Sequence, residues 1–325
     1  MPGLLRAFCR LLLLCSIAMI GLGALAQTRS ANESVIIVSS DDGSAYAEAA
    51  QAVLTELVRS GVSRNDVRLM TASELVDAGQ AGRLAQPRVF LTLGSLAAEI
   101  LSQEVAGVPL APVLCALIPR SSFERIARQR SPKAAQRFSA IYLDQPLRRQ
   151  LALIRLVWPQ SQRLGVLWGT ESVVRAPALR ALAQPLGWTL VEAQMDTANG
   201  LFPALKQVAN DSEVMLALPD PQVYNSSSIR NILLAAMRKQ VPLVAFSPAY
   251  VRAGALMALY QTPTQAGQQA AGLALDVLRG KSLPAMPIES SDFEVGVNRH
   301  VASALNLDLD PQELRLALRR QEHLP

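Results

Sequence analysis

Histidine is scarce in this chain: only His300 and His323 are present, and both lie near the C-terminus. A Ser-His-Asp or Cys-His site needs an imidazole within reach of its nucleophile, and both histidines follow the segments that should build the core. The sequence also lacks H-E-x-x-H, paired C-x-x-C and the G-x-x-x-x-G-K-[ST] loop, so zinc and Walker-type nucleotide sites have no support. We therefore expect no catalytic residue, no metal and no cofactor. An enzyme that uses only carboxylates stays open as an alternative.

Cysteine is almost as rare, with three residues. Cys9 and Cys15 lie in an N-terminal apolar segment and would leave with it, so Cys115 alone remains and no internal disulfide can form. Because Cys115 stands in the apolar run Val113-Leu-Cys-Ala-Leu117, we expect a buried small hydrophobic side chain rather than a nucleophile.

The N-terminus has the pattern of an export signal. Arg6 and Arg10 form a basic region, residues 11–25 an apolar stretch, and Ala24-Leu-Ala26 a cleavage site. We predict cleavage after Ala26 and a periplasmic product; an uncleaved anchor is the alternative. No later apolar run is long enough to cross a bilayer.

The charge balance is mild, with a formal net charge of +5 to which the two leader arginines contribute. Basic residues cluster from Arg120 to Arg137, but aromatic residues hardly occur among them. We expect a solvated surface there rather than a docking patch for an anionic partner, and no nucleic acid.

Short apolar runs alternate with amphipathic segments, which is typical of parallel α/β sheets whose strands are buried on both faces. Gly61 should end the first helix, and Thr71 and Ser95 should cap two later ones. The sequence thus predicts an α/β fold with two Rossmann-like lobes. The expected strands lie at residues 35–39, 67–70, 88–93, 112–117, 163–168, 189–192, 214–218, 241–246 and 255–260.

The two series of strands place the domain boundaries. Residues 1–26 form the signal peptide, residues 27–139 with about 256–285 the N-terminal lobe, and residues 140–255 with about 286–325 the C-terminal lobe. Crossings near residues 140–143, 254–256 and 290–293 should contain the hinge.

Two apolar strands, each followed by a polar loop that carries a tyrosine, form the most informative stretch. They read Val214-Met-Leu-Ala-Leu-Pro-Asp-Pro-Gln-Val-Tyr-Asn225 and Val241-Pro-Leu-Val-Ala-Phe-Ser-Pro-Ala-Tyr250. Ligands of parallel sheets bind outside the carboxyl ends of the strands. Turn formation and helix capping explain part of these polar residues, but not the two tyrosines.

These loops, the segment Gln268-Gln-Ala-Ala-Gly-Leu-Ala-Leu-Asp-Val-Leu-Arg-Gly280 and the segment Val295-Gly-Val-Asn-Arg-His-Val-Ala-Ser-Ala-Leu-Asn-Leu307 carry a family likeness. The chain resembles the ABC transporter substrate-binding proteins whose members include binders of aromatic amino acids. The resemblance implies a type I periplasmic-binding fold, with two lobes, three crossings and a ligand in the cleft between the lobes. The Leu143-Asp-Gln-Pro146 turn resembles a less-studied branch of exported relatives.

The resemblance also implies a set of ligand-binding residues at the strand ends. Ser95, at a helix N-terminus, would meet a ligand carboxylate, and Asp220 could pair with an ammonium group. Tyr224 and Tyr250 would stack on or edge a flat ligand. The full set is Ser39, Ser40, Gly94, Ser95, Ala116, Gly169, Thr170, Asp220, Tyr224, Asn225, Ser247 and Tyr250.

We therefore expect a monomeric, non-catalytic, exported solute-binding protein that closes around a small polar or aromatic ligand, such as an amino acid, by hinge motion. The resemblance implies an ABC permease as its partner. A ligand sensor or accessory protein with no transport role is the alternative that sequence cannot separate from it.

Overall fold

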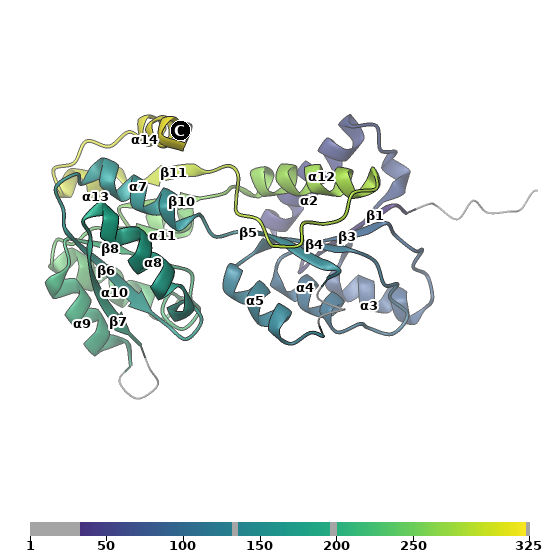
Figure 1. Ribbon diagram of the computed structural model, residues 1–325, viewed down its shortest axis with the longest axis horizontal. Helices are drawn as coiled ribbons and strands as arrows, with labels where there is room; N and C mark the ends of the chain where they lie inside the picture. Colours follow the sequence, from purple (N-terminus) through teal and green to yellow (C-terminus); the bar gives the residue numbers. More distant parts are fainter. Residues whose placement is uncertain (1–32, 132–135, 196–199, 323–325) are drawn as a thin grey trace, which may run out of the picture. The chain divides into compact units, whose positions relative to one another are not determined.

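Two β-sheets organise the chain. The computed structural model describes residues 33–131, 136–195 and 200–322. The first sheet has strand order β2-β1-β3-β4-β5 and the second β11-β10-β9-β8-β6-β7 (Figure 1). Among the described strands, neighbours run parallel except β10 and β11. The predicted α/β class with two parallel-sheet lobes is confirmed, whereas the predicted signal peptide lies outside the described residues.

The first sheet is covered by helices on both faces. Alternation along β1 decides which face each side chain meets: Val35 and Ile37 pack toward one set of helices, and Ile36 and Val38 toward the other. The strands are β1 (Val35–Ser39), β2 (Val67–Thr71), β3 (Val89–Leu93), β4 (Val113–Ile118) and β5 (Phe138–Tyr142). One face carries α2 (Ser44–Arg59) and α12 (Pro263–Leu278), and the other α3 (Ala72–Gln80), α4 (Ser95–Ser102) and α5 (Arg120–Arg128).

The second sheet is built in the same way. In β8, Val214 and Leu216 face one core while Met215 faces the other. Its strands are β6 (Arg163–Trp168), β7 (Thr189–Gln194), β8 (Val214–Leu216), β9 (Leu243–Ala245), β10 (Met257–Tyr260) and β11 (Glu294–Val297). One face carries α7 (Leu147–Val157), α8 (Ala176–Ala183), α13 (Arg299–Ala304) and α14 (Pro311–Glu322), and the other α9 (Leu201–Asp211), α10 (Ile229–Arg238) and α11 (Pro248–Ala253).

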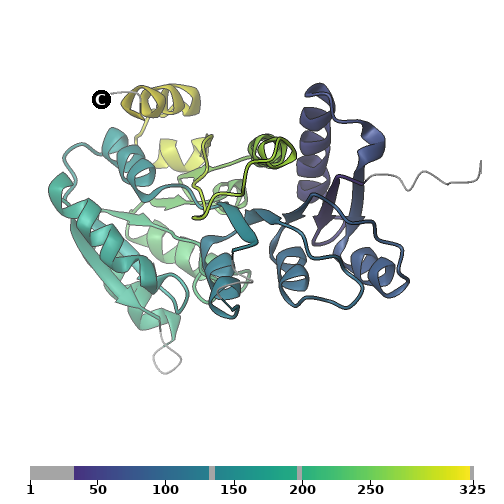
Figure 2. The ribbon, with the colours of Figure 1, turned by 45° about the vertical axis from the view of Figure 1, so that its right-hand side comes forward.

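The chain passes between the sheets three times, and the first two crossings come later than the sequence predicted. β5 stays in the first sheet up to Tyr142, and β10 pairs in parallel with β9, so the chain leaves the second sheet only at Gln261. A bridge from Ile141 to Ile288 precedes the third crossing, which leads into β11 as expected. The excursion between the last two crossings places α12, yellow-green in Figures 1 and 2, against α2 of the first sheet.

Local signals at helix ends fold as their chemistry dictates. Thr71 caps α3 in a capping box with Glu74, as predicted. Gly61 follows α2 with a φ of 92°, and its N–H donates to the Val58 carbonyl while that of Val62 donates to Leu57. This is a Schellman motif, so the predicted end of the first helix is confirmed.

Cys115 lies in the middle of the first sheet and has no exposed surface. Burial raises the pKa of its thiol to about 12, so the nucleophilic thiolate does not form near neutral pH. Its predicted burial is confirmed. No helix within the described ranges is both long and apolar enough to cross a membrane.

The contact between α2 and α12 depends on one glycine. A Cβ at Gly267 would collide with the Ala49 carbonyl and lie 2.9 Å from the Ala52 Cβ. We expect Gly267→Ala to lower the free energy of unfolding by about 1–3 kcal/mol, because overpacking outweighs the better helix propensity of alanine. Denaturant unfolding measures the change.

Gly272, in the same helix, provides a matched control. Nothing lies within 4 Å of a Cβ added there. Gly272→Ala should therefore raise the free energy of unfolding by about 0.5–1 kcal/mol. Equal effects of the two substitutions would contradict the close packing of α2 on α12.

Candidate functional site

The carboxyl ends of β1 and β3 meet at one loop pair in the first sheet. The hydroxyl of Ser40 donates to the Leu93 carbonyl at 3.1 Å and accepts the N–H of Ala97 at 3.2 Å. Ala97 is the third residue of α4, so Ser40 supplies the cap of this helix from another loop. The prediction that Ser95 is the N-cap is wrong. Ser95 is the first helical residue, and Gly94 precedes it with a φ of 95° that few other residues adopt.

The Ser40 hydroxyl accepts only the third N–H group of α4, that of Ala97. In the described part of the chain, no acceptor is recorded for the backbone N–H groups of Ser95 and Leu96. A Cβ on Gly94 would lie 2.7 Å from the Tyr46 hydroxyl, so only glycine fits between the two loops. Burial raises the pKa of Tyr46, and the Asp41 carboxylate adds to the shift, so the phenol stays a neutral donor.

A pocket of about 280 Å³ opens beside these loops, at the ends of β1 and β2. Ser39 lines it together with acidic and hydroxyl groups that sequence reasoning did not select for the site. The Asp41 carboxylate also accepts the N–H of Gly43 at 2.7 Å, which stabilises the turn before α2. The polar residues that line the pocket are Ser39, Asp41, Asp42, Tyr46, Thr71 and Glu74.

The end of β4 carries backbone strain. Leu117 has a φ of 51°, and the pairing of β4 with β5 shifts register between Cys115 and Ile118. Such strain costs about 1–3 kcal/mol and gathers at functional sites. Its neighbour Ala116 is fully buried, and its carbonyl accepts the N–H of Gly94. Ala116 therefore contributes backbone to this edge, not an exposed side chain.

In the second sheet, the Asp220 carboxylate joins two loops. It accepts N–H groups of Glu171 at 3.1 Å, Ser172 at 2.8 Å and Gln222 at 2.9 Å, and it is 2% exposed. A Cβ on Gly169 would lie 2.5 Å from its Oδ2, so the close approach requires glycine. Asp220 is thus a buried anchor of the loops; its predicted pairing with an ammonium group remains a prediction.

The other predicted residues of this edge divide into structural and accessible groups. The Asn225 side chain accepts the N–H groups of Ser227 and Ser228 and donates to the Pro221 carbonyl, which builds the turn before α10. Thr170 is exposed, and its N–H donates to Gln222. Ser247 is partly exposed at the start of α11.

The two tyrosines do not share one environment. Tyr224 is 5% exposed and packs edge-on against Phe246 and Tyr250, with ring centroids 5.9 and 6.2 Å away. Its ring belongs to the core of the second sheet, and burial raises its pKa. Tyr250 is only half-buried, and its hydroxyl donates to the Tyr224 carbonyl at 3.0 Å. Of the two, Tyr250 alone offers an accessible ring edge.

The first crossing carries an ionic contact that sequence reasoning missed. Asp144 accepts the N–H of Arg120, at the start of α5, at 2.7 Å and pairs with Arg175, which follows β6, at 2.9 Å. Their carboxylate and guanidinium are 6% and 10% exposed. Burial lowers the pKa of Arg175, and Asp144 opposes the shift. One carboxylate thus contacts elements on both sides of the crossing.

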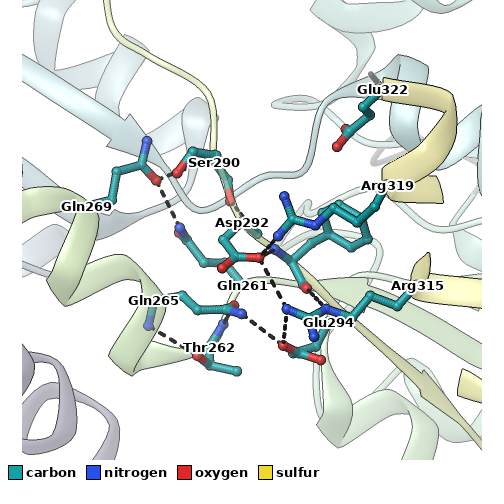
Figure 3. A network of polar contacts seen from close by, with 12 residues as sticks. Gln261, Thr262, Gln265, Gln269, Ser290, Asp292, Glu294, Arg315, Arg319 and Glu322 are labelled. Atoms are coloured by element: carbon teal, nitrogen blue, oxygen red, sulfur yellow. Dashed lines mark hydrogen bonds and ion pairs between the residues drawn. The ribbon is translucent and has the colours of Figure 1, made fainter. Parts of the chain in front are cut away.

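The second and third crossings are joined by amide side chains (Figure 3). Gln269 accepts from the Gln261 side chain at 3.0 Å and from the N–H of Ser291 at 3.1 Å. Gln265, which forms a capping box with Thr262, donates to Glu294 at 2.8 Å. These contacts hold α12 to the strand that returns to the second sheet.

Helix α14 covers the third crossing. Arg315 donates to the Phe293 carbonyl at 2.9 Å, and Arg319 pairs with Asp292 (Figure 3). The guanidinium carbons of Arg149 and Arg319 lie 4.5 and 4.6 Å from the Phe293 ring centroid. The buried ring is therefore held by two cations from separate helices.

Comparison with known proteins identifies the family. The profile described as "ABC transporter substrate binding protein" matches residues 74–319. The chain belongs to this family. The membership predicted from the loop and helix motifs is therefore confirmed.

Individual relatives are more distant. A curated tyrosine-binding protein from Clostridioides difficile (strain R20291) is 24% identical over 163 residues, and the match spans about half of each chain, 49% of this one and 47% of the relative.

Solved structures share the fold. A ligand-free, open substrate binding protein with adhesive properties from Clostridium difficile has a TM-score of 0.66 at 18% identity and covers 86% of this chain and 96% of its own. A Streptococcus pneumoniae ABC domain in complex with L-Trp has a TM-score of 0.56 at 14% identity, covering 86% and 97%. At these identities the likeness concerns the fold of substrate-binding family members.

The role of Asp220 as a loop anchor can be measured. We expect Asp220→Ala to lower the free energy of unfolding by about 2–4 kcal/mol, because three backbone N–H groups lose their buried acceptor. Asp211→Ala, at an exposed position, should change it by less than about 0.5 kcal/mol. Denaturant unfolding compares them, and equal stability of both variants would show that the loops do not depend on this carboxylate.

Proposed function

We propose that this protein is an exported, non-catalytic binding protein that holds a small amino-acid-like ligand between its two lobes for ABC-type uptake. One observation carries the proposal: α4 begins at the carboxyl edge of the first sheet with N–H groups for which the described residues supply no acceptor, and Ser40 holds that helix start in place. Such a start favours an anionic group, and a ligand carboxylate is the simplest one.

Other groups at the same sheet edges suit the remainder of an amino acid. The pocket with Asp41, Asp42 and Glu74 favours an ammonium group, and Tyr250 could edge a flat side chain. A tyrosine-binding protein is among the similar sequences, and a protein of the same fold was solved in complex with L-Trp, which supports an aromatic amino acid. Export after cleavage at Ala26, a monomeric state and a membrane permease as partner belong to the same proposal.

Closure of the lobes would complete the site. The backbone next to Asp144, Gln261 and Phe293, at the three crossings, is where we expect bending while helices stay intact. A ligand that touches both lobes stabilises the closed state through contacts that the open state lacks.

Thermal unfolding of the mature chain tests the ligand class. At about 100 times its dissociation constant, L-Tyr or L-Trp should add about 2.7 kcal/mol and raise the melting temperature by several degrees. The radius of gyration from X-ray scattering should fall on binding. A panel of amino acids, nucleosides and sugars with no effect on either quantity would refute the proposed ligand class.

A substitution at Ser95 separates binding from stability. We expect Ser95→Asp to weaken binding of an amino-acid carboxylate by at least about 10-fold, because a second anion would occupy the helix start. The same carboxylate should stabilise the free protein by about 0.3–1 kcal/mol through the helix dipole. Calorimetric titration and unfolding report the two effects.

Ser102→Asp, at the other end of the same helix, is the control and should leave affinity unchanged. Undiminished affinity of Ser95→Asp would place the ligand carboxylate elsewhere.

A further inference from the structure

Helices α9 and α10 lie side by side on one face of the second sheet. Their inner faces bury Leu205 and Val208 from α9 and Ile232 and Ala236 from α10. On the outside, a groove of about 390 Å³ runs between them. It lies away from the strand ends that form the proposed ligand site.

The side chains that line this groove follow one spacing on both helices. Counted from the first lining residue, they stand at i, i+3, i+4, i+7 and i+8, so each helix presents a continuous stripe. The stripes are Phe202, Leu205, Lys206, Ala209 and Asn210 on α9, and Asn231, Leu234, Ala235 and Arg238 on α10 with Lys239 directly after it. Two neighbouring stripes of this kind form the seam into which a third helix packs.

The groove exposes large apolar side chains. Phe202 is 74% exposed and Leu234 41%. Single exposed hydrophobic residues are ordinary, but these two line one groove. Phe and Arg are enriched at protein–protein interfaces, and Phe202 and Arg238 line this groove, so the composition favours a protein partner.

The charge of the groove has one sign. Lys206, Arg238 and Lys239 line it, and none of the described residues that line it carries a carboxylate. No ion pair is recorded for these three cations within the described ranges, whereas Arg163 and Arg180 of the same lobe pair with Glu213 and Glu192. The groove is therefore complementary to an acidic partner.

We propose that this α9–α10 groove docks an acidic amphipathic helix of a partner protein. Each stripe covers nine residues, so a facing helix needs about two to three turns, or about 12 Å, to span it. Its apolar side chains lie along Phe202 and Leu234, and its carboxylates face the three cations. Concavity and helical spacing favour such a helix over a flat membrane surface.

A synthetic peptide provides the probe. It is a fluorescein-labelled, helix-stapled peptide of about 16 residues with Leu at i, i+3, i+4 and i+7 positions and Glu on the flanks, long enough to span the groove with about one extra turn at each end. Fluorescence anisotropy should show saturable binding to the full chain. Lys206→Glu/Arg238→Glu should weaken it by at least about 10-fold. A peptide with Lys in place of Glu should bind this double variant better than the unaltered protein.

Arg128→Glu/Arg148→Glu is the matched control, because both residues are exposed, lie outside the groove and change the net charge equally. It should bind the acidic peptide like the unaltered protein. Since the substituted residues are exposed, thermal unfolding should confirm that every variant is folded, and L-Tyr binding at the strand ends should not respond to either pair. The proposal is independent of the amino-acid ligand.

Three results would overturn the proposal. One is an acidic peptide that does not bind, and another is equal binding to all variants. The third is charge-dependent binding to phosphatidylglycerol vesicles without peptide binding, which would assign the groove to a membrane surface instead.

Discussion

Burial of both faces of two parallel sheets is the constraint on which the rest of this structure depends. A parallel strand cannot turn back on its neighbour by a short hairpin, so each connection must pass over a face as a helix. All loops at one edge of each sheet then follow a strand and precede a helix. Ser39, Gly94, Gly169 and Ser247 stand at such positions. Polar residues and glycines gather at these edges because the parallel topology brings the strand-to-helix loops together there.

At those edges, side chains from loops that are distant in the sequence cap a helix and fix a loop, which are roles that neighbouring residues usually fill. Ser40 caps α4, and the Asp220 carboxylate fixes the loop that follows β6. Both contacts are buried, so removing either acceptor would leave backbone N–H groups unpaired and would lower the free energy of unfolding. These buried contacts hold the loops in place, and further side-chain contacts join the elements at the crossings near Asp144, Gln269 and Phe293.

The sequence was informative where structure is decided locally. Apolar runs and their spacing predicted the strands, and the caps at Thr71 and Gly61 were found because their partners lie within a few residues. It failed where partners are remote. The assignment of Ser95 as a cap was wrong because the cap is Ser40, which lies 57 residues before Ala97, the residue whose N–H it accepts. The second crossing was predicted too early, because the residues of β10 do not reveal that this strand pairs with β9.

The same dependence on remote partners explains why the sequence did not reveal the burial of Tyr224 or the pairing of Asp144 with Arg175. A tyrosine after a strand is equally suited to a ligand site or a core, and only the packing of Phe246 decides that Tyr224 is buried. Asp144 and Arg175 could not be paired from sequence, because 31 residues separate them. Local chemistry predicts which edge carries the site, and tertiary packing decides which side chains are available there.

The cap that Ser40 supplies to α4 has a consequence for the order of assembly. The N–H of Ala97 reaches its acceptor, Ser40, only after β1 and β3 have paired. The start of α4 therefore cannot be capped while its segment of the chain is isolated. The helix start that would receive an anion therefore comes into being late, with the whole sheet. Partly folded forms of this lobe would contain the helix without the capped start that we propose as the carboxylate site, so on this proposal they could not sequester solute before the chain is fully assembled.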